Sequence, residues 1–171
     1  MSFFATYDGS SYQLTTAGFT ALVIIMIAIL LIGCAIFGGK KKFSAKQLAF
    51  SAMAIALAMV TSMIKLFDMP MGGSVTLLSM LFIVLIGYWY GLGAGLTAAF
   101  AYGILQLVVD PYIISVPQML VDYLFAFGAL GLSGLFSKSK HGLIKGYIAG
   151  VLGRYFFAFL SGWIFFGMYA P

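Results

Sequence analysis

An aspartate and a glutamine in the run VPQMLVDYLFAF, residues 116–127, are the side chains best suited to chemistry. An ionised carboxylate in an apolar helix costs free energy unless a partner, a ligand or a polar cavity faces it. Gln118 and Asp122 are four residues apart, so on a helix they share one face. The pair predicts a polar pocket in which Asp122 accepts hydrogen bonds from, or pairs in charge with, a cationic or amine-bearing ligand.

Composition places this pocket in a membrane protein. Of the 171 residues 63% are hydrophobic and 8% are charged, whereas soluble domains have about 45–50% apolar residues. The sequence predicts a single domain, 1–171, with an all-α fold in the form of a six-helix transmembrane bundle. The six apolar segments are 17–38, 44–67, 75–90, 91–109, 117–137 and 142–168.

The charges predict which way the bundle faces. Seven of the nine basic residues fall in two loops, and the positive-inside rule assigns both loops to the cytoplasm; they are Lys40, Lys41, Lys42 and Lys46, then Lys138, Lys140 and Lys145. The N- and C-termini are then outside. All four acids, Asp8, Asp68, Asp110 and Asp122, fall in the outer half. We therefore expect the pocket to open outward.

Several kinds of enzyme site are missing from the sequence. It has no GxxxxGK[ST], HExxH or GxSxG motif, no glutamate, and only one histidine, His141, and one cysteine, Cys34. An enzyme, a metal centre and a cofactor are therefore not expected, and the chain is not expected to hydrolyse ATP unaided.

Three readings compete with a ligand pocket at Asp122. The acid could pair with Arg154, which lies deeper in its own helix. The chain could be a self-sufficient secondary transporter or channel for a small cation, although that class favours inverted repeats and polar groups at the membrane midplane. It could also be a purely structural membrane subunit.

Two further stripes are open to two interpretations each. Small residues four apart, such as Ala52 and Ala56 in FSAMAIALAMV, allow close helix approach, either inside the bundle or against another membrane protein. In the last segment Ala158, Gly162 and Phe166 form a stripe with Trp163 close by. Such a stripe packs helices or cradles a cationic or heteroaromatic ligand.

Four stretches together resemble the thiamine-specific branch of the S-components, the substrate-binding subunits of energy-coupling-factor (ECF) vitamin transporters. In family order they are MPMGGSVTLLSM (69–80), YGLGAGLTAAFAYGILQ (90–106), VPQMLVDYLFAFGALGLSGLF (116–136) and RYFFAFLSGWIFFGMYAP (154–171). In that family an acid followed by tyrosine contacts the vitamin, and these fall on Asp122 and Tyr123. The family's histidine is replaced by Ala158, which leaves thiamine, its pyrimidine precursor and other amine-bearing vitamins as expected ligands.

The resemblance implies high-affinity vitamin capture from outside, in the plasma membrane of a prokaryote. Import would need a transmembrane coupling protein and two ATPase subunits, docked on the face of Ala52 and Ala56. The expected ligand-binding residues are Asp122 as anchor, Tyr123 and Gln118 as polar contacts, and Phe166, Trp163 and Tyr7 as stacking rings. Gly162 between Ala158 and Phe166, Asp8 as a second acceptor, and Ser74 in a glycine-rich lid loop complete the set.

The order of the segments differs from the family's order. The family's sixth helix begins with a tyrosine-asparagine pair and follows the segment that ends here at Pro171. The stretch FFATYDGSSY (3–12) looks like that start, with Tyr7 and Asp8 at the pair. A circular permutation, with the last helix moved to the front and joined through GGKKKFSAK (38–46), explains this. A shorter homologue with an unrelated leading helix is the alternative.

Overall fold

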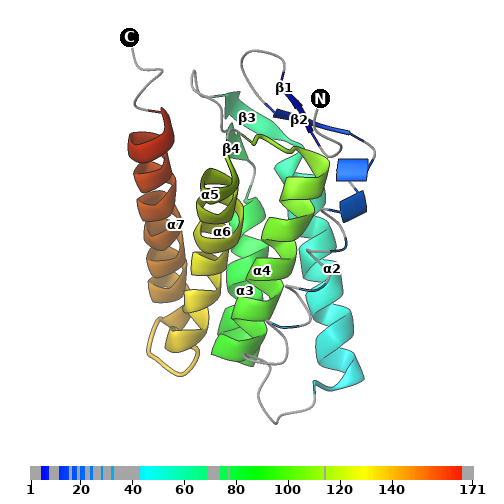
Figure 1. Cartoon of the computed structure of the whole chain (residues 1–171). Helices are drawn as coiled ribbons and strands as arrows, with labels where there is room; N and C mark the ends of the chain where they lie inside the picture. Colours follow the sequence, from blue (N-terminus) through cyan, green and yellow to red (C-terminus); the bar gives the residue numbers. More distant parts are fainter. Residues whose placement is uncertain are drawn as a thin grey trace.

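The protein is described by a computed structural model that covers residues 5–7, 12–15, 17–18, 20–21, 24, 28, 32, 43–68, 74–76, 78–113 and 115–166. Its long elements run side by side as a bundle (Figure 1). They are α2 (Ala45–Ser62), α3 (Ser79–Tyr90), α4 (Leu92–Val109), an irregular helix over 116–136, and α7 (Gly142–Phe166). Within the described residues four of these have the length and composition of membrane spans, whereas α3 is shorter.

The irregular helix changes its winding three times. It comprises α5 (Val116–Met119), the π-helical η1 (Leu120–Phe125), α6 (Ala126–Gly128) and the 3₁₀-helical η2 (Ala129–Phe136). Ser115 caps its start, because the serine hydroxyl accepts a hydrogen bond from the Gln118 N–H at 3.3 Å. Wide π turns are rare and often occur at functional sites. Asp122 and Tyr123 both lie in the π segment.

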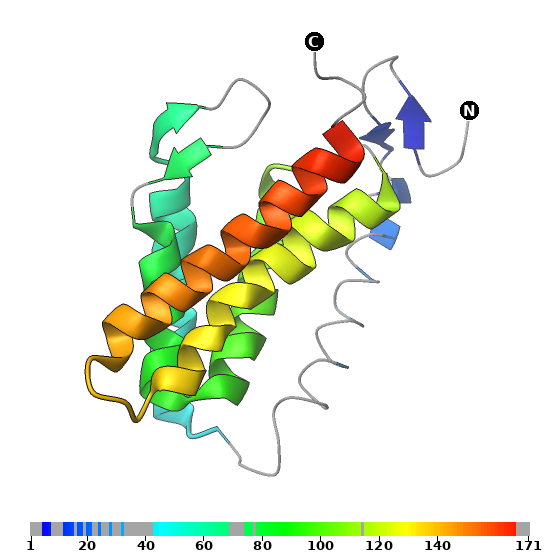
Figure 2. The same cartoon turned by 90° about the vertical axis from the view of Figure 1, so that its left-hand side faces the viewer.

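The core lies where α3, α4 and η2 meet, with α2 on one side and α7 on the other (Figure 2). Ile83, Val84, Tyr102 and Leu130 are among its fully buried side chains. The predicted segments 75–90 and 91–109 correspond to α3 and α4, which form a hairpin with a very short turn. Gly87–Tyr90 continues α3, and Gly91 alone makes the turn with a φ of 87°, a conformation that favours glycine.

Two antiparallel hairpins lie at the end of the bundle where α7 ends (Figure 1). The strands β1 (Ala5–Tyr7) and β2 (Tyr12–Leu14) form one, and β3 (Lys65–Asp68) and β4 (Ser74–Thr76) form the other. The second hairpin corrects two predicted helices. The segment 44–67 stays helical only to Ser62, and the segment 75–90 becomes helical only at Ser79.

The early end of α2 has a local cause. Thr61 and Ser62 turn their hydroxyls back onto the carbonyls of Leu57 and Met59, at 2.8 and 2.7 Å. These bonds satisfy carbonyls of the last turn, and strand pairing satisfies the backbone beyond it. Lys65, expected at a helix end, therefore lies in a strand.

The described charges separate along the bundle. Lys46 is in the first turn of α2, Lys138 and Lys140 are exposed in the loop between η2 and α7, and Lys145 is exposed in the first turn of α7. Figure 1 shows both regions at the end opposite the strands. The expected grouping of these lysines is thus present, whereas Lys40–Lys42 and Asp8 lie outside the described residues.

Candidate functional site

The site lies where α7 runs antiparallel to the π segment η1. Three side-chain contacts join the two helices: Ser161 with Asp122, Phe157 with Phe125, and Arg154 with Phe127. The phenylalanine rings stack at 5.8 Å, and the Arg154 guanidinium lies 4.0 Å above the Phe127 ring. From Arg154 to Ser161 along α7, the partners run backwards from Phe127 to Asp122, as they must between antiparallel helices. These contacts fix the register of α7 against the helix 116–136.

Gln118 positions the carboxylate of Asp122. Its Nε2 donates one hydrogen bond to Oδ2 of Asp122 at 2.6 Å and another to the Tyr112 carbonyl at 3.2 Å. A side-chain amide has two N–H hydrogens, so both are committed. Gln118 is 1% exposed. The structure therefore brings together the two polar residues that the sequence placed on one face, with Gln118 acting on the acid and on the neighbouring loop.

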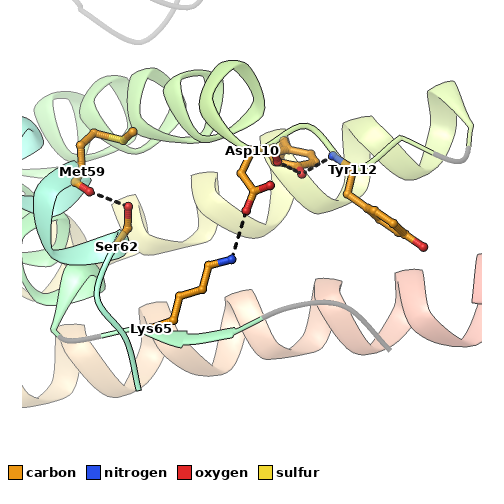
Figure 3. Close-up of polar contacts among 6 residues, drawn as sticks. Met59, Ser62, Lys65, Asp110 and Tyr112 are labelled. Carbon is orange, nitrogen blue, oxygen red and sulfur yellow. Dashed lines mark hydrogen bonds and ion pairs between the residues drawn. The ribbon is translucent and has the colours of Figure 1, made fainter. Parts of the chain in front are cut away.

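Tyr123 holds the same loop from the next position. Its hydroxyl donates to the Asp110 carbonyl at 2.9 Å and accepts from the Tyr112 N–H at 3.0 Å. Lys65 of β3 reaches the loop from the other side through an ion pair with Asp110, at 3.5 Å (Figure 3). The loop that follows α4 is thus fastened both to η1 and to the β3–β4 hairpin.

Ser161 is the polar residue that sequence reasoning missed. It is 1% exposed and interacts with the Asp122 carboxylate. Its hydroxyl nevertheless makes no hydrogen bond of normal length and angle with the residues that the structure describes. The signal for it was the spacing of Arg154, Phe157 and Ser161, which are three and then four residues apart and so share one helix face. We call Gln118, Asp122, Tyr123 and Ser161 the polar cluster.

Arg154 does not form a direct salt bridge with Asp122 in the described part of the chain. The two groups still attract each other electrostatically. The arginine charge instead lies over the Phe127 ring, in a cation–π contact. The acid is therefore partly balanced in charge, and the hydrogen bond from Gln118 goes to one of its two oxygens, Oδ2.

Other expected site residues have different surroundings. Trp163 is 72% exposed and its ring meets Phe159 at 6.0 Å, so among the described contacts it is not joined to Asp122. Ser74 lies in β4, paired opposite Asp68. Tyr7 has its backbone in β1. The side chains of Tyr7 and Phe166, and the whole of Asp8, lie outside the described residues.

Gly162, the residue after Ser161 on α7, is loosely surrounded by the described residues. A side chain added at Gly162 would meet no atom within 4 Å, whereas one added at Gly146 or Gly150 of the same helix would meet backbone or side-chain atoms at 3.0 to 3.5 Å. The described residues contain no group of three histidines, cysteines or acids that could hold a metal. The arrangement can bind a hydrogen-bond donor at Asp122, because a carboxylate can accept further hydrogen bonds beside the one from Gln118.

Comparison with known proteins agrees with the helical membrane fold and with a role in transport rather than catalysis. The model of the family described as "Thiamine transporter protein (Thia_YuaJ)" matches residues 48–171. The thiamine transporter ThiT of Bacillus subtilis (strain 168) is 37% identical over 135 residues, 71% of this chain and 69% of that protein. A solved structure of ThiT from Listeria monocytogenes matches with a TM-score of 0.60 and 28% identity, covering 73% of this chain and 75% of the other. This chain therefore belongs to the thiamine transporter protein (Thia_YuaJ) family.

Proposed function

We propose that the protein captures thiamine, or a related amine-bearing heterocycle, from outside the cell and serves as the S-component of an ECF-type ABC transporter. The observation that carries the proposal is the held carboxylate of Asp122, whose Oδ2 accepts a hydrogen bond from Gln118 at 2.6 Å while Ser161 lies beside the same carboxylate. Family membership names the ligand class. The carboxylate supplies the acceptor that an amino group needs.

The site residues then divide into three roles. Asp122 anchors the ligand, and Gln118 and Tyr123 hold the acid and the loop Asp110–Tyr112 in place. The remaining expected residues enclose the ligand. Phe166, Trp163 and Tyr7 supply rings, Gly162 leaves room, Asp8 adds an acceptor, and Ser74 belongs to the hairpin that covers the site.

Binding of thiamine is tested by calorimetry on the purified protein, with the pyrimidine precursor of thiamine and unrelated vitamins as further ligands. Asp122→Asn keeps the shape of the side chain but removes its charge, and we expect the affinity to fall by about tenfold or more. Asp110→Asn is the matched control, because Asp110 is 72% exposed and pairs with Lys65 instead. Equal binding by wild type and Asp122→Asn contradicts the anchoring role, and absence of binding by the wild type contradicts the function.

Import requires partners, because the chain carries no nucleotide-binding motif. We propose that the transmembrane coupling protein, with its two ATPases, docks on Ala52 and Ala56. Both alanines are exposed on α2, whereas Ala54 and Ala58 are buried in the bundle at 8% and 0% exposure. The two alanine pairs therefore have separate surroundings, and only one is available to a partner.

Docking and binding can be separated by experiment. Ala56→Trp fills the proposed contact face, so it should abolish vitamin uptake by cells while leaving thiamine affinity of the purified protein unchanged. Ile144→Trp, at a residue 60% exposed on α7, is the control and should leave both unchanged. Normal uptake by Ala56→Trp contradicts the docking face.

We propose that the lysine-rich end faces the cytoplasm of a prokaryotic cell and that both termini are outside. A circular permutation also remains our proposal for the residues before 48, where the family match begins. A variant with residues 1–43 moved behind Pro171 should then bind thiamine as the wild type does. A chain of residues 44–171 alone should lose binding. Full binding by the shortened chain contradicts the permutation.

A further inference from the structure

The hydroxyl of Ser161 behaves unlike the other helix hydroxyls. Thr61 and Thr97 donate to the carbonyl one turn back, at 2.8 and 2.9 Å. Ser133, equally buried, donates to the carbonyl of Val84 at 3.1 Å. Ser161 does none of these within the described structure, although its hydroxyl is buried. A buried hydroxyl without a partner is unfavourable, so its place beside Asp122 needs an explanation.

The two groups form a matched pair of oxygens. Oδ1 of Asp122 can only accept a hydrogen bond, while Oγ of Ser161 can donate or accept because its hydrogen rotates about the C–O bond. They come from different helices, η1 and α7, which the Phe157–Phe125 and Arg154–Phe127 contacts hold in register. The acceptor and the hydroxyl are therefore held together at the interface of the two helices.

We infer that Ser161 is a specificity-determining residue that donates a hydrogen bond to a ring nitrogen of the ligand, next to the amino group held by Asp122. This inference rests on the proposed function and names the part of the ligand that is read. A 4-aminopyrimidine ring, the kind that thiamine carries, has this edge: an N–H donor beside a nitrogen acceptor.

The charges at the site favour a ligand edge with one donor and one acceptor over a ligand edge with two donors. A cationic amidinium would donate to both oxygens, but the positive Arg154 already attracts Asp122 and partly balances its charge. A second full positive charge at the same place gains less than a neutral amino group beside a ring nitrogen. A neutral edge also needs a hydrogen-bond donor for its ring nitrogen, and the Ser161 hydroxyl can supply one.

The test is a cycle of two proteins and two ligands, measured by calorimetry. The ligands are thiamine and an analogue with C–H in place of the pyrimidine nitrogen beside the amino group. Ser161→Ala should weaken thiamine binding by about five- to tenfold and leave binding of the analogue almost unchanged. Ser133→Ala removes an equally buried hydroxyl far from the cluster and should change neither affinity. Ser161→Cys, which keeps the size with a weaker donor, should fall between wild type and alanine.

The outcomes separate the two proposals. Equal losses for thiamine and the analogue, or no loss for either, overturn the role of Ser161 while leaving the proposed function intact. Failure of the wild type to bind thiamine overturns both. Thermal unfolding of each variant shows whether the fold is retained, and the ligand difference within one variant is independent of any loss of stability.

Discussion

The two ends of the interface between α7 and the helix 116–136 are built differently. At the lysine-rich end Gly146 lies so close to Ser133 that an added Cβ would be 3.0 to 3.1 Å from its atoms. At the other end a Cβ added at Gly162, the residue after Ser161, would meet no atom of the described residues within 4 Å. Close packing at the lysine-rich end holds α7 against η2, whereas the end that carries Ser161 is packed more loosely. We propose that the loosely packed end is the one that binds the ligand.

The same substitution at both ends of the interface is the most direct test of this difference in packing. Gly146→Val should lower the free energy of unfolding by about 2–3 kcal/mol, because the backbone of Ser133 cannot move aside. Gly162→Val should change it by less than about 1 kcal/mol, since no neighbour is displaced. Thermal unfolding in detergent measures both, and equal destabilisation would contradict the difference in packing.

Loss of Gln118 should have the next largest effect. Gln118→Leu removes the donor to Asp122 and to the Tyr112 carbonyl. We therefore expect the free energy of unfolding to fall by about 1–3 kcal/mol and thiamine binding to weaken about tenfold. Gln106→Leu is the control, because its amide donates to Tyr102 at 2.7 Å instead. If both variants weaken binding equally, positioning by Gln118 is refuted.

Removal of one hydroxyl should loosen the loop by a smaller amount. Tyr123→Phe leaves the Tyr112 N–H and the Asp110 carbonyl without their partner, at a cost of about 1 kcal/mol. Faster hydrogen exchange of the Tyr112 amide, by about fivefold, is the expected result. Tyr155→Phe, at a ring 67% exposed on α7, should leave that exchange rate unchanged. An unchanged rate in Tyr123→Phe would show that the loop is held elsewhere.

The surface ion pair should matter least. Lys65 and Asp110 are 46% and 72% exposed, and exposed pairs contribute about 0.2–1 kcal/mol. Lys65→Met should therefore lower the unfolding midpoint slightly in low salt and not at all in about 1 M NaCl, where the charges are screened. A double-mutant cycle with Asp110→Asn isolates the pair. A loss that persists in high salt would point to packing of the lysine stem instead.

Much of the bundle was predictable because membrane helices are long and apolar. The segments 91–109 and 117–137 correspond to α4 (Leu92–Val109) and to the helix 116–136 within a residue. The β3–β4 hairpin was not predictable, because KLFD and SVT are too short to be told from helix ends. Pairing between segments that are apart in the chain decides their structure, and periodicity does not report it.

The site was predictable in part for the same reason. Gln118 and Asp122 are four apart on one helix, so their contact follows from local geometry. Ser161 depends on the register between two helices, which a single sequence does not contain. Trp163, which is close in sequence to the expected stripe, is 72% exposed, and its role as a stacking ring stays a prediction.

The π segment Leu120–Phe125 sets an angle as well as a winding. An α-helix rotates by about 100° per residue and a 3₁₀-helix by about 120°, so each change of winding turns the faces before it relative to those after it. Deleting Leu124 would leave the packed glycines and Asp122 chemically intact, yet it would swing the acid around the helix axis and away from α7. The winding of the π segment therefore determines the direction in which Asp122 points, and the residues that pack the helix do not.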